Sequence, residues 1–195
     1  AWDLDALITT VRQTHPRIAY LIPDFQNPTG LLMADEDRHR VAAALTAART
    51  VPLVDESHVA LRLDDGEQPT AFAAHAPNTV SIGGSSKAYW GGLRVGWLRV
   101  PPALVTRLVE ARLGLDLGAP ILEQLVLTRL LTGSEADAAP QRERLRVQRD
   151  VLAAELREKL PDWRFRLPAG GLSLWCELPR QAAAALAVEA ERRGV

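Results

Sequence analysis

Lys87 is a residue whose type and surroundings in the sequence could let it react with a carbonyl group. An apolar run from Thr79 to Ile82 ends at two glycines, and Lys87 then lies between Ser86 and a Gly-rich turn. Partial desolvation lowers the pKa of a lysine and frees its lone pair for attack on a carbonyl carbon. Arg94 follows seven residues later and offers a planar fork that suits phosphate. The alternative interpretation is an ordinary surface lysine beside an ordinary ion-pairing arginine.

Two more polar residues follow apolar runs earlier in the chain. Asn27 comes after Ile18 to Ile22, and Asp55 comes directly after Val51 to Val54. Short apolar runs bounded by turn residues predict buried strands, and ligands of open parallel sheets bind at the carboxyl ends of strands. We therefore expect Asn27, Asp55 and Lys87 on one rim. The alternative is that Asp55 caps a helix and Asn27 shapes a turn, which are common roles of these residue types.

These residue types share one possible chemistry. A carboxylate such as Asp55 keeps a ring nitrogen protonated, Lys87 holds an aldehyde as an imine, the Asn27 amide bonds a phenolate oxygen, and Arg94 holds a phosphate. Those are the needs of pyridoxal 5'-phosphate. The protonated ring is an electron sink, so the C–H bond beside the nitrogen of an amino acid becomes acidic. The displaced Lys87 is then placed to move the proton, which makes it the candidate catalytic residue.

The intervening segments predict the elements that position these residues. Asp3 is a plausible N-cap for a helix whose apolar stripe runs from Leu4 to Val11, and a second helix is expected from Ala34 to Arg49. Strand, helix and strand in alternation predict an α/β fold with a partial, doubly wound, mostly parallel sheet. Alternation from Val95 to Arg99 predicts one more strand, at a sheet edge.

The second half of the chain predicts helices and a smaller unit. Helices are expected from Ala103 to Leu113 and from Pro120 to Thr132, and the second is apolar on most faces, which favours a core position over a subunit interface. A long amphipathic helix follows from Asp137 to Lys159. Alternation around PAGG then indicates a small antiparallel unit, and the Ala-rich run from Ala182 to Ala187 indicates a helix. We expect a large domain over residues 1–139 and the start of a smaller α+β domain over 140–195.

Composition narrows the function classes. The chain has 195 residues, 47% of them hydrophobic, which is enough to bury a core. A net charge of -1 gives no electrostatic reason to expect nucleic acid or an anionic membrane as a partner of this segment. No apolar run approaches the roughly 20 residues of a membrane span, and no group of residues predicts a metal site. The lone Cys176 favours a reducing, cytoplasmic compartment. Both ends lead us to expect a piece of a longer protein.

Four segments resemble the class I/II aminotransferases, which are fold-type-I pyridoxal phosphate proteins. The segments are PDFQNPTG, VPLVDES, SSKAYWGGLRVGW and PAGGLSLWCELP, in the order of the family. The resemblance implies that Asn27 contacts the cofactor, that Asp55 faces the pyridine nitrogen and that Lys87 carries the imine. It also implies that Arg94 holds the phosphate. The interval from Lys87 to Arg94 and the FQNPTG wording are most similar to the MocR branch of GntR-type regulators, in which a winged helix precedes an aminotransferase-like domain.

The chain also departs from the family pattern. Gly84 stands where the family usually has a phosphate-binding Ser or Thr, so Ser85 is the candidate substitute. His58 stands where many members have a Tyr that bonds the phenolic oxygen, and a histidine can donate that bond. The Gly-rich phosphate loop and the ring-stacking aromatic of the family lie outside this chain. We therefore expect cofactor binding in the full-length protein and weak or absent binding by this chain alone.

Three functions remain open from the sequence. The first is part of the effector-sensing, pyridoxal-phosphate-binding domain of a MocR-like regulator, with an amino acid or amine as its small-molecule partner and a homodimer as its assembly. The second is part of a free-standing aminotransferase that transfers an amino group from an amino acid to a 2-oxo acid. The third is a cofactor-free dimerisation module. Whether the full-length protein is an enzyme is left undecided by the sequence.

Overall fold

A four-stranded mixed sheet organises the first half of the chain. The computed structural model describes residues 2–116, 118–133, 139–180 and 182–194. The sheet order is β1-β2-β3-β4, with β1 (Ile18–Leu21), β2 (Val51–Asp55) and β3 (Val80–Gly84) parallel and β4 (Gly96–Arg99) antiparallel to β3. The predicted α/β fold with a mostly parallel sheet is confirmed, as is the position of the last strand at an edge.

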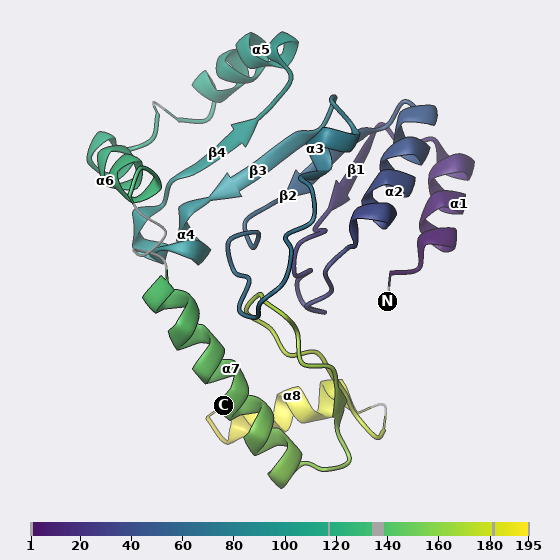
Figure 1. Cartoon of the computed structure of the whole chain (residues 1–195), viewed down its shortest axis with the longest axis vertical. Helices are drawn as coiled ribbons and strands as arrows, with labels where there is room; N and C mark the ends of the chain where they lie inside the picture. Colours follow the sequence, from purple (N-terminus) through teal and green to yellow (C-terminus); the bar gives the residue numbers. More distant parts are fainter. Residues whose placement is uncertain (1, 117, 134–138, 181, 195) are drawn as a thin grey trace.

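Three helices cover one face of this sheet (Figure 1). They are α1 (Leu4–Thr14), α2 (Asp35–Ala47) and α3 (Phe72–His75). Their apolar side chains pack on Leu21 of β1 and Val54 of β2 to form the main core. The expected cap of α1 is confirmed, because the carboxylate of Asp3 accepts a hydrogen bond from the Ala6 amide at 2.9 Å.

The opposite face of the sheet is open at β1. Side chains alternate between the two faces of a strand, so Ile18 and Tyr20 point away from the helices. Ile18 is 60% exposed and Tyr20 is 55% exposed. The prediction that Ile18 to Ile22 forms a buried strand is therefore right for the face that packs on the helices and wrong for the opposite face, which is exposed. An apolar run alone does not show whether both faces of a strand are covered.

Beyond β3 the chain enters α4 (Ser85–Ala88) and the short 3-10 helix η1 (Gly91–Leu93) before β4. Two helices follow, α5 (Pro102–Leu113) and α6 (Ile121–Leu131). Leu127 is the buried residue of α6, whereas Ile121 and Leu122 are 74% and 75% exposed. The expectation that α6 lies in the core is wrong, because its remaining apolar side chains face outward.

The last part of the chain extends away from the sheet and returns to it (Figure 1). It contains α7 (Ala139–Lys159), β5 (Arg164–Phe165), β6 (Cys176–Glu177) and α8 (Ala183–Arg192). β5 and β6 pair antiparallel, as the alternation around PAGG predicts. Residues 137 and 138 of the expected long helix lie outside the described residues, and the domain boundary near Pro140 stays a prediction. None of the described helices has the length and apolar character needed to cross a membrane.

The PAGG segment docks on the loop that follows β2. The Gly171 amide donates to the Leu61 carbonyl at 2.9 Å, and the Leu63 amide donates to the Ala169 carbonyl at 2.9 Å. A Cβ atom on Gly170 would lie 2.4 Å from the Leu61 carbonyl oxygen, closer than any side chain tolerates. Gly170 therefore allows the two backbones to approach, which joins the smaller unit to the sheet.

A buried ion pair ties α2 to the loop after β1. The Arg38 guanidinium donates to Asp24 Oδ1 at 2.7 Å, and both side chains are 1% exposed. Arg38 also donates to the Met33 carbonyl at 3.0 Å and to the Thr70 carbonyl at 3.1 Å, and the Gln68 amide donates to Asp24 at 2.7 Å. These bonds satisfy both charges in the interior and join three separate segments.

We expect Arg38→Met to destabilise the chain strongly. The substitution leaves the Asp24 carboxylate buried and unpaired, and breaking a buried pair in this way costs about 3–5 kcal/mol. Urea unfolding followed by circular dichroism measures the loss. Arg40→Met on the same helix is the matched control, because Arg40 meets Asp5 at 3.5 Å with side chains 48% and 95% exposed. Equal destabilisation by the two variants would contradict the role assigned to the buried pair.

Candidate functional site

The centre of the candidate site is the Asp55 carboxylate at the carboxyl end of β2. Its Oδ1 accepts a hydrogen bond from the Ser57 amide at 2.8 Å, and its Oδ2 accepts one from the Tyr20 hydroxyl at 2.7 Å. Burial acts to raise the pKa of Asp55, but these hydrogen bonds and the nearby His58 ring together hold it below the ordinary value of 3.8. Asp55 is therefore a negative charge at neutral pH.

Tyr20 is the partner of Asp55 from the neighbouring strand. The hydrogen bond to Asp55, with smaller contributions from burial and from the negative charge itself, raises the pKa of Tyr20 to about 12. The phenol therefore stays protonated and keeps donating across the physiological pH range. Sequence reasoning missed this contact. Its only signal was the position of Tyr20 within an otherwise apolar strand, one residue before the strand ends.

Lys87 lies just beyond β3, at the same end of the sheet as Asp55, where the parallel strands have their carboxyl ends. It belongs to the short helix α4, and its side chain is exposed. Among the described residues it has no hydrogen bond or ion pair, so its amine is available for chemistry. Because β2 and β3 are parallel neighbours, their carboxyl ends bring Asp55 and Lys87 to one rim.

The two residues predicted to hold phosphate differ in their surroundings. Ser85 is fully buried, and its hydroxyl donates to the Val95 carbonyl at 2.7 Å. That hydroxyl would have to leave Val95 to donate to a phosphate. Arg94 is exposed and has a left-handed backbone with φ 52°, directly after η1. Its guanidinium reaches the Gly91 carbonyl at 3.5 Å, so most of its donors face solvent.

Asn27 lies in the loop that follows β1. Its side chain is exposed, and its backbone carbonyl accepts a hydrogen bond from the Gln26 side chain at 2.6 Å. The peptide bond from Asn27 to Pro28 is cis. The Gln26 amide donates to the Leu31 carbonyl at 2.9 Å, which closes the loop on itself. The loop therefore presents Asn27 on a turn built by Gln26.

His58 connects this loop to the segment after β2. The His58 ring is buried, with Nδ1 3.2 Å from the Phe25 carbonyl oxygen. Phe25 is 1% exposed and packs against Gly170 and Gly171 of the PAGG segment. One buried aromatic side chain thus joins three segments that are distant in the sequence. We call these segments together, residues 22–31, 56–64 and 168–173, the loop junction.

The structure brings together some predicted residues and leaves others apart. Asp55 and His58 interact electrostatically, and Lys87 lies on the same rim. Within the described residues no hydrogen bond or ion pair joins Asn27, Lys87 or Arg94 to Asp55. The predicted roles in cofactor binding stay predictions for all six positions: Asn27, Asp55, His58, Ser85, Lys87 and Arg94. Sequence reasoning also missed the Arg38–Asp24 pair and the packing of Phe25. Both are tertiary contacts, which the spacing of residues along the sequence does not show.

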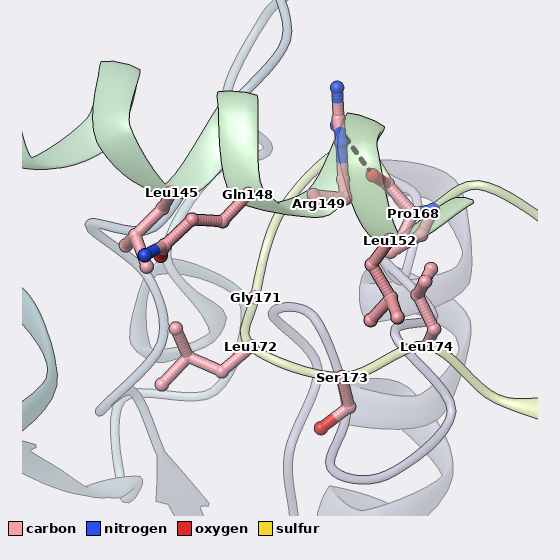
Figure 2. A pocket seen from close by; sticks show the side chains of 9 residues that line it. All are labelled: Leu145, Gln148, Arg149, Leu152, Pro168, Gly171, Leu172, Ser173 and Leu174. Atoms are coloured by element: carbon pink, nitrogen blue, oxygen red, sulfur yellow. Dashed lines mark hydrogen bonds between the residues drawn. The ribbon is translucent and has the colours of Figure 1, made fainter. Parts of the chain in front are cut away.

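A separate cavity of about 150 Å³ lies between α7 and the PAGG segment (Figure 2). Four of its nine lining residues are leucines, its polar members are Gln148, Arg149 and Ser173, and it contains none of the predicted site residues. Arg149 borders the cavity and donates to the Pro168 carbonyl at 2.8 Å and to Asp64 at 2.7 Å. This arginine is 8% exposed and attaches α7 to the loop junction.

The fold is that of one known family. The chain belongs to the aminotransferase class I and II family, which it matches over residues 1–192. It is 34% identical over 187 residues to the 2-aminoadipate transaminase of Thermus thermophilus, covering 91% of this chain and 46% of that protein. The predicted resemblance to this family is confirmed.

A regulator and a solved structure are also among the relatives. The chain is 29% identical over 169 residues to the uncharacterised HTH-type transcriptional regulator YisV of Bacillus subtilis, covering 84% of this chain and 35% of that protein. The crystal structure of LysN, the alpha-aminoadipate aminotransferase of Thermus thermophilus complexed with N-(5'-phosphopyridoxyl)-L-leucine, superposes with a TM-score of 0.85. Identity there is 31%, over 94% of this chain and 49% of that one. The chain spans about half the length of the curated relatives it matches.

We expect the stabilising effect of the Asp55 charge to depend on pH. Its folded-state pKa is depressed, so the contribution is full above the ordinary value of 3.8 and is lost as pH falls through the folded pKa. The stability difference between the wild type and Asp55→Asn should therefore shrink as pH is lowered from about 6 to about 3. Urea midpoints at several pH values measure this. A constant difference would show that the charge of Asp55 contributes nothing.

Proposed function

We propose that this chain is the part of a pyridoxal-phosphate-binding domain that supplies the lysine and the pyridine-nitrogen carboxylate. Lys87 would carry the cofactor, and Asp55 would face its ring nitrogen. One observation carries this proposal: an ionised carboxylate and an amine without a partner among the described residues lie at the carboxyl ends of adjacent parallel strands. Family membership supports it, and so does the phosphopyridoxyl compound held by the structural relative LysN.

The residues at this edge fit the cofactor chemically. A pyridine nitrogen becomes an effective electron acceptor when it is protonated, and an adjacent carboxylate stabilises that proton. The depressed pKa of Asp55 keeps it in the required form. A Cβ atom placed on Gly84 would meet no atom within 4 Å, so there is open space beside the end of β3. Charge, amine and space thus coincide.

Each residue has a separate task in this proposal. Bound at this edge, the cofactor would supply an electron sink for the bond beside the nitrogen of an amino acid. Lys87 would hold the cofactor and move a proton at its Nζ atom once that amine is released. Asp55 would hold the ring proton, and His58 and Asn27 would lie on the side of the phenolic oxygen. Arg94 would bind the phosphate with donors that face solvent in this structure.

Among the functions that use such a domain, we propose effector sensing in a MocR-like regulator. The similarity to YisV supports this function. So do two departures at the cofactor contacts, because Gly84 offers no phosphate donor and His58 replaces the usual phenol. A free-standing aminotransferase is the second candidate, favoured by the 34% identity to the transaminase of Thermus thermophilus. We further propose an amino acid or amine as the small molecule, a cytoplasmic location, and a homodimer formed through the exposed apolar side chains of α6.

We expect borohydride reduction of the complete protein with pyridoxal phosphate to leave a phosphopyridoxyl group on Lys87. Reduction traps the bond between the amine and the cofactor, and peptide mapping locates it. The chain has two lysines, Lys87 and Lys159. Lys159 is the internal control, because it is exposed on α7 and pairs with Glu155 at 2.5 Å. Lys87→Ala should remove the label, and Lys159→Ala should leave it unchanged.

Other outcomes separate the competing functions. Labelling of both lysines to the same extent would refute a specific site, and no labelling at all would support the cofactor-free dimerisation module. If Lys87 is labelled, half-reactions with amino acids distinguish the remaining two. Conversion of the amino acid to its 2-oxo acid over many cycles indicates an aminotransferase. A spectral response to an amino acid without turnover, together with amino-acid-dependent DNA binding, indicates a regulator.

A further inference from the structure

We propose that Tyr20 is a positioning residue, which fixes the Asp55 carboxylate in the orientation that a protonated ring nitrogen requires. The inference deepens the proposed function and rests on it. Tyr20 acts through Asp55 and needs no contact with the cofactor.

The geometry of two adjacent strands creates this contact. Residues Tyr20 and Leu53 are partners in the parallel register of β1 and β2, and Asp55 lies two residues beyond Leu53 on the same face. The Tyr20 ring therefore spans from β1 toward the end of β2, where its hydroxyl meets Asp55 Oδ2 at 2.7 Å. A shorter side chain at position 20 would leave that oxygen without its donor.

Two donors from different directions hold the carboxylate. The Ser57 amide binds Oδ1 at 2.8 Å, and the Tyr20 hydroxyl binds Oδ2. A carboxylate offers about four lone-pair sites, so each oxygen keeps capacity for one more donor. A ring N–H can therefore bind while both existing hydrogen bonds stay in place. Without Tyr20, the remaining hydrogen-bond donors would both belong to Ser57, and rotation of the carboxylate would be less restricted.

The electrostatics make Tyr20 a permanent donor. Coupling between two groups is reciprocal, so one contact both raises the pKa of the phenol and lowers that of the carboxylate. The other titratable group acting on Asp55 is His58, from the segment that follows β2. The neighbouring strand β3 places Ile82 beside Asp55 and Gly84 at this edge, and neither carries a charge. Two hydroxyls act on this carboxylate in the described part of the chain: that of Ser57, two residues further along, and that of Tyr20, from the neighbouring strand.

The first experiment measures the contact without cofactor. Isotope-labelled tyrosine NMR of the apo protein follows ionisation of the Tyr20 phenol, whose resonance is assigned by its disappearance in Tyr20→Phe. An ordinary tyrosine with a pKa of about 10 is roughly nine-tenths ionised at about pH 11. We expect Tyr20 to remain mostly protonated there, and to ionise at a distinctly lower pH in Asp55→Asn, where only partial burial still raises its pKa. The chain has one other tyrosine, Tyr89, whose resonance persists in Tyr20→Phe.

The second experiment tests whether Tyr20 acts through Asp55 on the cofactor. Dissociation constants for pyridoxal phosphate are measured near neutral pH for the complete wild-type protein, Tyr20→Phe, Asp55→Asn and the double variant. One hydrogen bond corresponds to a loss of about three- to tenfold in affinity for Tyr20→Phe. In the Asp55→Asn background, the same tyrosine substitution should have almost no further effect. That non-additivity distinguishes positioning from a general structural role, which would give additive losses.

Specific results would overturn the inference. Ionisation of Tyr20 at an ordinary pH in the wild type shows that the contact does not form. Unchanged affinity in Tyr20→Phe, or equal losses in the presence and absence of the Asp55 carboxylate, shows that Tyr20 does not position it. If the wild type fails to bind pyridoxal phosphate, the proposed function fails, whereas the NMR titration still decides whether Tyr20 holds Asp55.

Discussion

The parallel pairing of β1, β2 and β3 is the constraint on which the other features of the molecule depend. Three parallel strands in a row place their carboxyl ends along one edge, whatever the sequence distance between them. Asp55 ends β2, and Lys87 follows β3 by three residues. The core between the sheet and helices α1 to α3 fixes this arrangement from one side only. The reactive groups therefore lie on the rim of a rigid half-covered sheet.

Contacts between loops then define the surroundings of that rim. Phe25 is the shared element, because its carbonyl meets His58 and its ring packs against Gly170 and Gly171. Two nearly buried arginines stabilise the junction. Arg38 pairs with Asp24, and Arg149 binds Asp64 and the Pro168 carbonyl. Each guanidinium distributes its donors over separate segments. The planar guanidinium, with its five N–H donors, can bond several acceptors at once.

The charge of Asp55 shows how local bonds overcome burial. Partial desolvation opposes ionisation, yet the hydrogen bonds from the Ser57 amide and hydroxyl and from the Tyr20 hydroxyl, together with His58, reverse its effect. Glu56, the next residue, shows the opposite balance: burial raises its pKa, and the hydroxyl of Ser81 compensates only in part. The pKa values of these two adjacent carboxylates thus shift in opposite directions because Asp55 accepts hydrogen bonds from Ser57 and Tyr20, whereas Glu56 accepts one from Ser81. The face that carries Asp55 is the one that also carries Tyr20.

The amino-acid sequence by itself determined the elements, the α/β class, the family and the candidate residues. Apolar runs, caps and Gly-Pro turns are local signals, and the motifs around Asn27, Asp55 and Lys87 carry enough specificity to identify relatives. Only the tertiary structure decided which face of each element is covered and which side chains meet. The exposure of Tyr20 and of α6, the Asp24–Arg38 pair and the engagement of Ser85 with Val95 all depend on neighbours distant in the chain. Spacing cannot encode such contacts, because the partner of a side chain is chosen by sheet register and loop packing.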